Sequence, residues 1–291
     1  MLTRLQPTAT RFSFPNHELS SRKSQAVEIE NEALLDPEWL SVKTTFSADY
    51  TRFAYALGSN FNAPPPGAYT QADRTVIKAG LSLPQITPGY YITPTVSFQS
   101  NTYNATANPA AFTGASPAAV QGFTIPTFSL DSGLAFERDA AELHGFFGRD
   151  MLLTMEPRAF YAYTPYQSQA NTPVFDTADA GFGVSQIFTA NTFIGNDRIA
   201  DTNAATLGLT SRMIESNTGA ERANVTIAQK QQFTAQKVGL NGNIASPTTY
   251  SDTLGSASVR LLGNFSADMF GQYNTQLNRF VQLFVTMHLG N

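Results

Sequence analysis

Few side chains in this sequence are of the types that carry out catalysis or bind metals. The three histidines, His17, His144 and His288, lie far apart, and there is no cysteine. A zinc site needs closely spaced His, Cys or acidic ligands, so no metal site is expected. Asp176 and Asp179 could act as paired carboxylates in acid–base chemistry or calcium binding, but a solvated pair on a loop is the simpler interpretation.

The motifs of common enzymes are also absent. The sequence contains no Gly-Xaa-Ser-Xaa-Gly elbow for a serine nucleophile and no Gly-Lys-Ser/Thr loop for nucleotide phosphates. The net charge of −4 and the lack of a basic stripe argue against nucleic acid as a partner. We therefore expect no catalytic residues, no cofactor and no enzymatic activity.

Many charged residues alternate with apolar residues, which places the two kinds on opposite faces of β-strands. From Pro126 to Glu137 the even-numbered positions are mostly apolar and the odd-numbered ones small or polar, and from Met151 to Tyr163 the odd-numbered positions are mostly apolar. The same period occurs at residues 42–49, 205–213, 223–230 and 257–261. The pattern predicts six polar side chains on a water-filled side: Asp131, Glu137, Glu156, Arg158, Arg212 and Lys230.

This alternation, without any apolar run of about 18 residues, is typical of a transmembrane β-barrel. Charged residues make up only 14% of the chain, against about 25% in ordinary soluble domains. Aromatic residues reach 12%, and several tyrosines fall near predicted strand ends, as in the aromatic girdles of barrels. We predict an all-β, antiparallel transmembrane barrel with about a dozen strands here. A soluble antiparallel sandwich with one wet face is the alternative, because its strands alternate too.

Several segments lack the strand pattern. The acidic run that contains Glu28, Glu30 and Glu32 is interpreted as part of a loop, with strands resuming near Ser41. Segments rich in Pro, Gly, Ala and Asn predict long loops at residues 60–69 and 104–121. Pro157 interrupts a strand pattern, and we expect it at a bulge or near a strand end because it cannot donate a ladder hydrogen bond.

The longest irregular segment runs from Thr164 to about Asp201. Long barrel loops normally face the extracellular side, and a loop with many apolar groups should be ordered. We predict that it folds over or into the mouth of the barrel, anchored by Asp197, Arg198 and Asp201. Its aromatic residues are Phe175, Phe182, Phe188 and Phe193.

Several blocks of sequence resemble one known family. They are Asp131–Asp139, Met155–Tyr161 and Gly195–Asn203, followed by Thr210-Ser-Arg212. Together they are similar to the outer-membrane lipopolysaccharide-assembly proteins, also called organic solvent tolerance proteins. The resemblance covers residues 123 to about 283, whereas residues 1–122 match only in general style and residues 284–291 do not follow the pattern well.

The resemblance implies a periplasmic jelly-roll domain followed by a very large barrel of about two dozen strands. Residues 1–291 correspond to the middle of that barrel, so we expect an incomplete, open sheet with the jelly roll absent. Residues 1–7 contain no apolar core of a secretory signal. A truncated or frameshifted reading frame is our hypothesis for these departures.

The function implied by the resemblance is transport without chemistry. Lipopolysaccharide would arrive from a periplasmic bridge protein through the jelly roll and enter the outer leaflet sideways among outer-membrane lipids, in the cell outer membrane of a Gram-negative bacterium. A lipoprotein would plug the lumen that the six polar residues line, although mutual charge pairing alone would also explain those residues. The alternative function is a porin or a plugged receptor.

Overall fold

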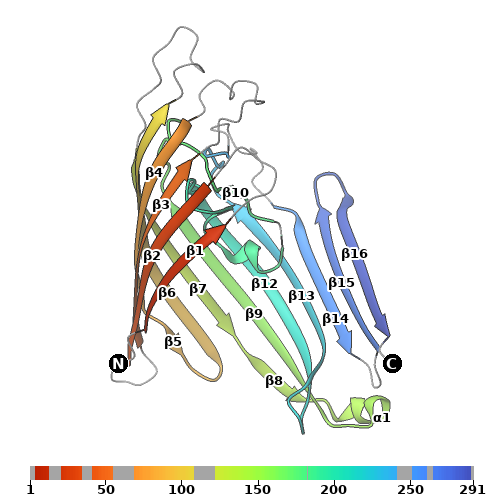
Figure 1. Cartoon of the computed structure of the whole chain (residues 1–291). Helices are drawn as coiled ribbons and strands as arrows, with labels where there is room; N and C mark the ends of the chain where they lie inside the picture. Colours follow the sequence, from red (N-terminus) through yellow and green to blue (C-terminus); the bar gives the residue numbers. More distant parts are fainter. Residues whose placement is uncertain are drawn as a thin grey trace.

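The computed structural model describes residues 4–12, 21–34, 41–54, 69–107, 122–181, 183–240, 251–260 and 265–289. A 14-stranded antiparallel sheet dominates this part of the chain (Figure 1). Its strands are β1 (Arg4–Phe12), β2 (Ser21–Leu34), β3 (Ser41–Ala54), β4 (Tyr69–Ser82), β5 (Gln85–Ile86), β6 (Tyr90–Ala107), β7 (Phe123–Leu134), β8 (Phe136–Asp139), β9 (Met151–Thr164), β12 (Thr202–Glu215), β13 (Glu221–Gln232), β14 (Thr253–Arg260), β15 (Phe265–Asn274) and β16 (Arg279–Leu289). The remaining elements are short: η2 (Ala141–Leu143), α1 (His144–Phe147), β10 (Ala178–Asp179), η3 (Gln186–Phe188) and β11 (Phe193–Ile194).

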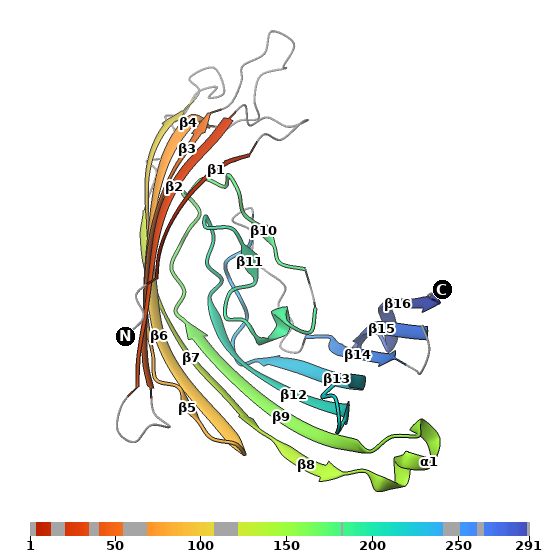
Figure 2. The same cartoon turned by 60° about the horizontal axis from the view of Figure 1, so that its bottom comes forward.

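The main strands follow one another through the sheet in chain order, from β1 to β16. They form a curved wall that does not close, and within the described sheet β1 and β16 each pair with one neighbour (Figure 2). The prediction of an open segment of an antiparallel β-barrel is therefore confirmed. Among the described residues, no helix is both long and apolar enough to cross a membrane.

The two faces of the wall carry the side chains that the alternation predicts. Leu207 on β12 is 65% exposed and Val225 on β13 is 56% exposed, whereas Thr206 is completely buried. The Thr206 hydroxyl donates a hydrogen bond to the carbonyl of Ile187, in the segment between β9 and β12 that occupies the concave side. The apolar positions therefore form the outer, convex face of the wall.

The interpretation of the acidic run as a loop is wrong. Glu28, Glu30 and Glu32 belong to β2, which pairs with β3 from Ser21 opposite Ala54 to Leu34 opposite Ser41. Val27 and Ile29 alternate with these acids, so the run has the same period of two as the other strands.

The two shorter predicted loops are also corrected at their ends. β4 begins at Tyr69, and β6 continues through Asn104 to Ala107. The rest of both segments, and Leu261 of the predicted C-terminal strand, lie outside the described residues.

The predicted position of Pro157 is wrong as well. Pro157 lies in the middle of β9, opposite Leu209 in an uninterrupted register with β12. The other neighbour of β9 is a strand that is divided at Ala135 into β7 and β8. Both parts pair with β9 in the same register. Since proline has no N–H to donate, this ladder is interrupted beside it. The Ala135 N–H faces β6, and it donates to the Gly89 carbonyl at 2.9 Å in continuation of the β6–β7 pairing.

Connections of different length leave the two ends of the wall. At one end lie the segment between β9 and β12, residues 165–201, and the segment between β13 and β14, residues 233–252. At the other end are shorter connections, at residues 83–89, 140–150 and 216–220 (Figure 1). In outer-membrane barrels the long loops are extracellular and the short turns periplasmic, which gives the wall its expected orientation.

A charge on the convex face should destabilise the barrel. We expect Val225→Arg to lower the free energy of unfolding by about 2–4 kcal/mol if Val225 sits at the bilayer midplane, because the cation would face hydrocarbon. Denaturant titration of a full-length family member carrying this segment, folded in lipid vesicles, would measure this change. The matched control is Thr226→Arg, which points into a cavity on the concave side. Equal losses for both variants would contradict the assignment of the faces.

Candidate functional site

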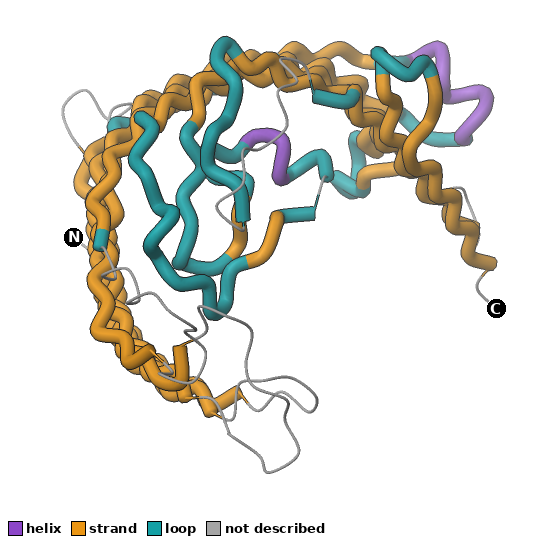
Figure 3. Tube along the Cα trace, turned by 90° about the horizontal axis from the view of Figure 1, so that it is seen from above, coloured by secondary structure: helices purple, strands orange, loops and turns teal. Residues whose placement is uncertain are grey.

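The segment from Pro165 to Asp201 folds back into the concavity of the wall. Figure 3, seen along the wall from above, shows its described residues inside the arc of strands. Its tip carries Ile187 and Phe188, which form an apolar cluster with Phe160, Ala228 and Leu254 of the wall. The concave face is therefore apolar where this segment, hereafter the inner loop, rests on it. The structure describes the whole inner loop except Phe182.

The ring of Phe188 packs at one defined position on the wall. An ideal Cβ built on Gly208 of β12 would lie 2.6 Å from Cζ of Phe188, so only glycine leaves room for the ring. The guanidinium carbon of Arg158 lies 4.3 Å from the centroid of the same ring, in a cation–π contact. Gly208 and Arg158 thus fix the tip of the inner loop between them.

Polar contacts to backbone carbonyls hold the same tip. Besides Thr206, the Thr202 hydroxyl donates to the Ala190 carbonyl at 2.8 Å. The Lys230 ammonium, which is nearly buried, donates to the Thr189 carbonyl at 3.0 Å. These bonds satisfy carbonyls that the loop would otherwise bury without a partner.

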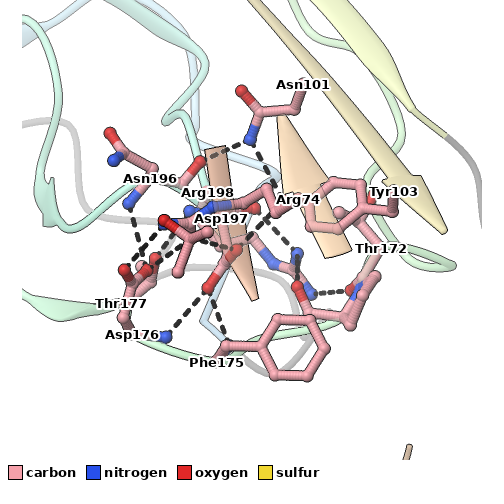
Figure 4. A network of polar contacts seen from close by, with 12 residues as sticks. Arg74, Asn101, Tyr103, Thr172, Phe175, Asp176, Thr177, Asn196, Asp197 and Arg198 are labelled. Atoms are coloured by element: carbon pink, nitrogen blue, oxygen red, sulfur yellow. Dashed lines mark hydrogen bonds and ion pairs between the residues drawn. The ribbon is translucent and has the colours of Figure 1, made fainter. Parts of the chain in front are cut away.

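The base of the inner loop is held by an ionic cluster centred on Arg74 of β4 (Figure 4). Its guanidinium donates two hydrogen bonds to the Asp176 carboxylate, at 2.6 and 2.8 Å, and a third to Oδ1 of Asp197 at 2.6 Å. Arg74 and Asp197 are both completely buried. The aromatic ring of Phe53 on β3 covers the guanidinium at 5.0 Å and stacks on Phe175 of the loop at 4.4 Å.

Asp197 organises the loop around this cluster. Its Oδ2 accepts hydrogen bonds from the N–H groups of Phe175 and Asp176, at 2.7 and 2.9 Å. Its Oδ1 also accepts a bond from the Tyr103 hydroxyl of β6 at 3.0 Å. One carboxylate therefore joins two stretches of the inner loop to two strands of the wall (Figure 4).

Neighbouring residues complete the attachment. The Asn101 amide of β6 donates to the Asn196 carbonyl at 2.5 Å. Gly195 has a φ of +82°, and an ideal Cβ there would lie 2.3 Å from the carbonyl oxygen of Asp176. Glycine is therefore required at the turn that brings Asp197 to Arg74.

Arg198 and Asp201, predicted as anchors together with Asp197, bond to backbone rather than to charged side chains. Arg198 donates to the carbonyls of Thr172 and Asp197 at 2.7 and 3.0 Å. Burial lowers the pKa of this guanidinium below its ordinary value, but arginine stays protonated in proteins. The Asp201 carboxylate accepts the N–H groups of Lys237 and Val238 at 2.8–3.0 Å, which ties the inner loop to the segment after β13.

The structure places the six predicted polar residues in different surroundings. Arg158 forms two hydrogen bonds with Asp131, at 2.9 and 2.5 Å. Arg212 lies 3.3 Å from Glu156 and 3.6 Å from Glu221. Lys230 contacts the inner loop as described above, and Glu137 is exposed on β8, opposite Thr154. The structure thus brings Asp131 together with Arg158, and Glu156 with Arg212, and leaves Glu137 and Lys230 apart from both pairs.

A cavity of about 560 Å³ lies between the loop tip and the wall. It is lined by Arg158 and Arg212, by hydroxyl groups such as Thr210 and Thr226, and by the ring of Phe188. Within the described residues, no group of three or more His, Cys, Asp or Glu side chains is arranged to hold a metal ion. Asp176, a candidate for acid–base chemistry, is instead bound to Arg74.

The central member of the ionic cluster, Arg74, is absent from the residues predicted from the sequence. It follows the same alternation as its neighbours on β4, and its carboxylate partners are 102 and 123 residues away. Asn101 and Tyr103 come just before residues 104–121, for which the sequence predicts a loop. No local signal marks these three residues.

The family match covers nearly the whole chain. A family model described as LPS transport system D (LptD) matches residues 25–290. The chain belongs to the LPS transport system D family. The resemblance drawn from the sequence blocks is confirmed. The LptD match is longer than the resemblance drawn from the sequence blocks, because it includes most of the first 122 residues and also residues 284–290.

Individual LptD relatives agree with the family match. The chain is 46% identical over 232 residues to the LPS-assembly protein LptD of Cupriavidus metallidurans, covering 79% of the chain and 27% of the relative. It is 42% identical over 238 residues to that of Burkholderia pseudomallei and 39% identical over 240 residues to that of Ralstonia nicotianae, each covering 81% of the chain and 28% of the relative. The chain therefore spans about a quarter of the length of these LptD relatives. Their names describe assembly, and none describes a catalytic reaction.

Removing the arginine at the centre of the cluster should release the base of the inner loop. Arg74→Ala leaves Asp176 and Asp197 without their cation, and breaking a buried ion pair in this way costs about 3–5 kcal/mol. We expect the loop of a folded full-length family member carrying this segment to become sensitive to added protease. Asp197→Asn should have a smaller effect, because Arg74 still has the Asp176 carboxylate as a partner. The control is Lys78→Gln on the same strand, and protection of the loop in Arg74→Ala would contradict the anchoring role.

Proposed function

We propose that this chain forms part of the wall of an outer-membrane barrel that assembles lipopolysaccharide into the outer leaflet of a Gram-negative outer membrane. The observation that carries the proposal is the LptD family match over residues 25–290, together with relatives named LPS-assembly protein. The apolar convex face and the long connections at one end of the wall support a position in the outer membrane.

The inner loop favours assembly over open-pore transport. It occupies the concavity of the wall and is attached at its base and at its tip by buried polar contacts. A porin needs a continuous water-filled path, and a loop held in this way narrows that path. Conductance of the full-length protein in a planar bilayer tests the porin alternative, which requires large, steady channels.

The proposed partners are those of a full-length protein of this family. They are lipopolysaccharide, a lipoprotein that plugs the lumen, a periplasmic bridge protein that acts through a jelly-roll domain, and the surrounding outer-membrane lipids. The ion pairs Asp131–Arg158 and Glu156–Arg212 line the side of the wall that faces the plug. Asp197, Arg198 and Asp201 hold the inner loop beneath the extracellular mouth, where it helps to seal the lumen.

Depletion of a full-length family member carrying this segment tests the function directly. Newly made lipopolysaccharide should stop reaching the cell surface and accumulate inside, and re-expression should restore its delivery. Delivery that continues at an undiminished rate after depletion would reject the proposal. Loss of small-solute uptake alone would support the porin alternative.

The seal formed by the inner loop should depend on Arg198. Arg198→Ala removes hydrogen bonds to the Thr172 and Asp197 carbonyls and leaves these groups buried, at a cost of about 1–3 kcal/mol for each unsatisfied group. In a full-length family member carrying this segment, we expect weaker copurification of the lipoprotein and entry of antibiotics that the outer membrane normally excludes.

Arg138→Ala is the matched control for this experiment. Arg138 is an exposed arginine that pairs with Glu142. It lies on β8, near the end of the wall opposite to the long connections. It should leave the lipoprotein complex and the permeability barrier unchanged. Normal assembly and an intact barrier in Arg198→Ala would reject the sealing role of the loop.

A further inference from the structure

A small pit lies where the start of the inner loop meets the segment after β13. Its volume is about 30 Å³, and Tyr166, Ser168, Arg198 and Lys237 are among the residues that line it. Tyr166, Ser168 and Lys237 are exposed, whereas Arg198 is only 3% exposed. The pit therefore reaches from the surface of the protein toward a buried guanidinium group.

The guanidinium of Arg198 has one N–H group that is not used. Its Nη atoms donate to the carbonyls of Thr172, Pro173 and Asp197, at 2.7, 3.4 and 3.0 Å. Its Nε is buried and has no hydrogen-bond partner within the part of the chain that the structure describes. Because an unsatisfied buried donor is costly, an acceptor in the pit would stabilise this arginine.

The charges of Arg198 and Lys237 also lack a direct counterion. Among the described residues, no carboxylate lies within ion-pair distance of either cation. The Asp197 carboxylate binds Arg74 and N–H groups of the loop, and the Asp201 carboxylate binds two other N–H groups. A buried charge needs a partner of opposite sign, which a water molecule does not supply.

The donors around the pit favour an anion over water. Guanidinium and ammonium groups donate hydrogen bonds but cannot accept them, so a water molecule between them would find few acceptors for its own hydrogens. The Lys237 ammonium lies 5.1 Å from the centroid of the Tyr166 ring, in a cation–π contact that holds it beside the pit. The volume is about that of one water molecule, so it suits a monatomic anion and not a phosphate or sulfate.

We infer that this pit binds a chloride ion, held by the Arg198 Nε and the Lys237 ammonium. The ion joins the inner loop to the segment after β13, next to the bonds that the Asp201 carboxylate makes with the same segment. The site is separate from the lumen and does not depend on the proposed function.

Bromide replacement tests the inference on crystals of a full-length family member carrying this segment. Bromide has a strong anomalous signal and binds where chloride does. We expect an anomalous peak in the pit, bonded to the Arg198 Nε. Density in the pit without an anomalous signal would identify a water molecule and overturn the inference.

Chloride NMR line broadening measures the same site in solution. Lys237→Gln should bind chloride about fivefold more weakly, because an exposed cation contributes up to about 1 kcal/mol to an ion pair and 1.4 kcal/mol is tenfold in affinity. Lys237→Arg keeps the charge and should restore binding. Lys78→Gln is the control, since Lys78 of β4 does not line the pit, and it should bind chloride like the unaltered protein.

Two further outcomes would overturn the inference. One is equal chloride binding by Lys237→Gln and the unaltered protein, both folded. The other is displacement of chloride by sulfate as readily as by bromide, which would mean that the ion lies on an open surface and not in the pit.

Discussion

Backbone hydrogen bonding in a hydrocarbon environment is the constraint on which this structure depends. A strand that crosses a membrane has no water to satisfy its N–H and C=O groups, so neighbouring strands must pair along their length. The antiparallel order of the wall, from β1 to β16 in chain order, satisfies this requirement with short turns at one end. Pro157 illustrates this requirement, because the strand that pairs with it is interrupted between β7 and β8 where the proline N–H is missing.

The same pairing fixes which side chains meet water and which meet lipid. One face of each strand is apolar and exposed, and the other faces the concavity, where the inner loop rests. The buried backbone groups of a loop in this position need hydrogen-bond partners. Asp197 provides them at the base, and Lys230 and two threonines provide them at the tip. The buried charge of Arg74 is acceptable because Asp176 and Asp197 surround it with three hydrogen bonds.

Much of the wall could be predicted from the sequence, because alternation is a local signal with a local cause. The faces of β12 and β13 follow directly from it, and the inner loop follows from the loss of the pattern after Thr164. The loop interpretation of Glu28, Glu30 and Glu32 is wrong because acidic residues occur in strands as well as in turns, and Val27 and Ile29 between them keep the period of two. In a barrel segment, acidic residues are as compatible with a water-facing strand position as threonine is.

The attachment of the inner loop could be predicted only in part. The block that contains Asp197, Arg198 and Asp201 stands out in the sequence as an element of the family resemblance. Its main partner, Arg74, does not stand out, because their contact joins residues 123 positions apart and no local pattern encodes it. Gly208 and Gly195 could not be assigned either, since each is explained by a ring or a carbonyl from a distant part of the chain.

The central claim is that this sheet is the wall of a membrane barrel, with lipid on its convex face and a water-filled interior on its concave face. Spin labels attached one at a time to β12 and β13 of a full-length family member, in lipid vesicles, test it most directly. Labels at Leu207, Leu209, Val225 and Ile227 should be relaxed by oxygen dissolved in lipid, and labels at Thr210 and Thr226 by a water-soluble nickel complex. Equal accessibility at neighbouring positions, or the opposite alternation, would contradict the account.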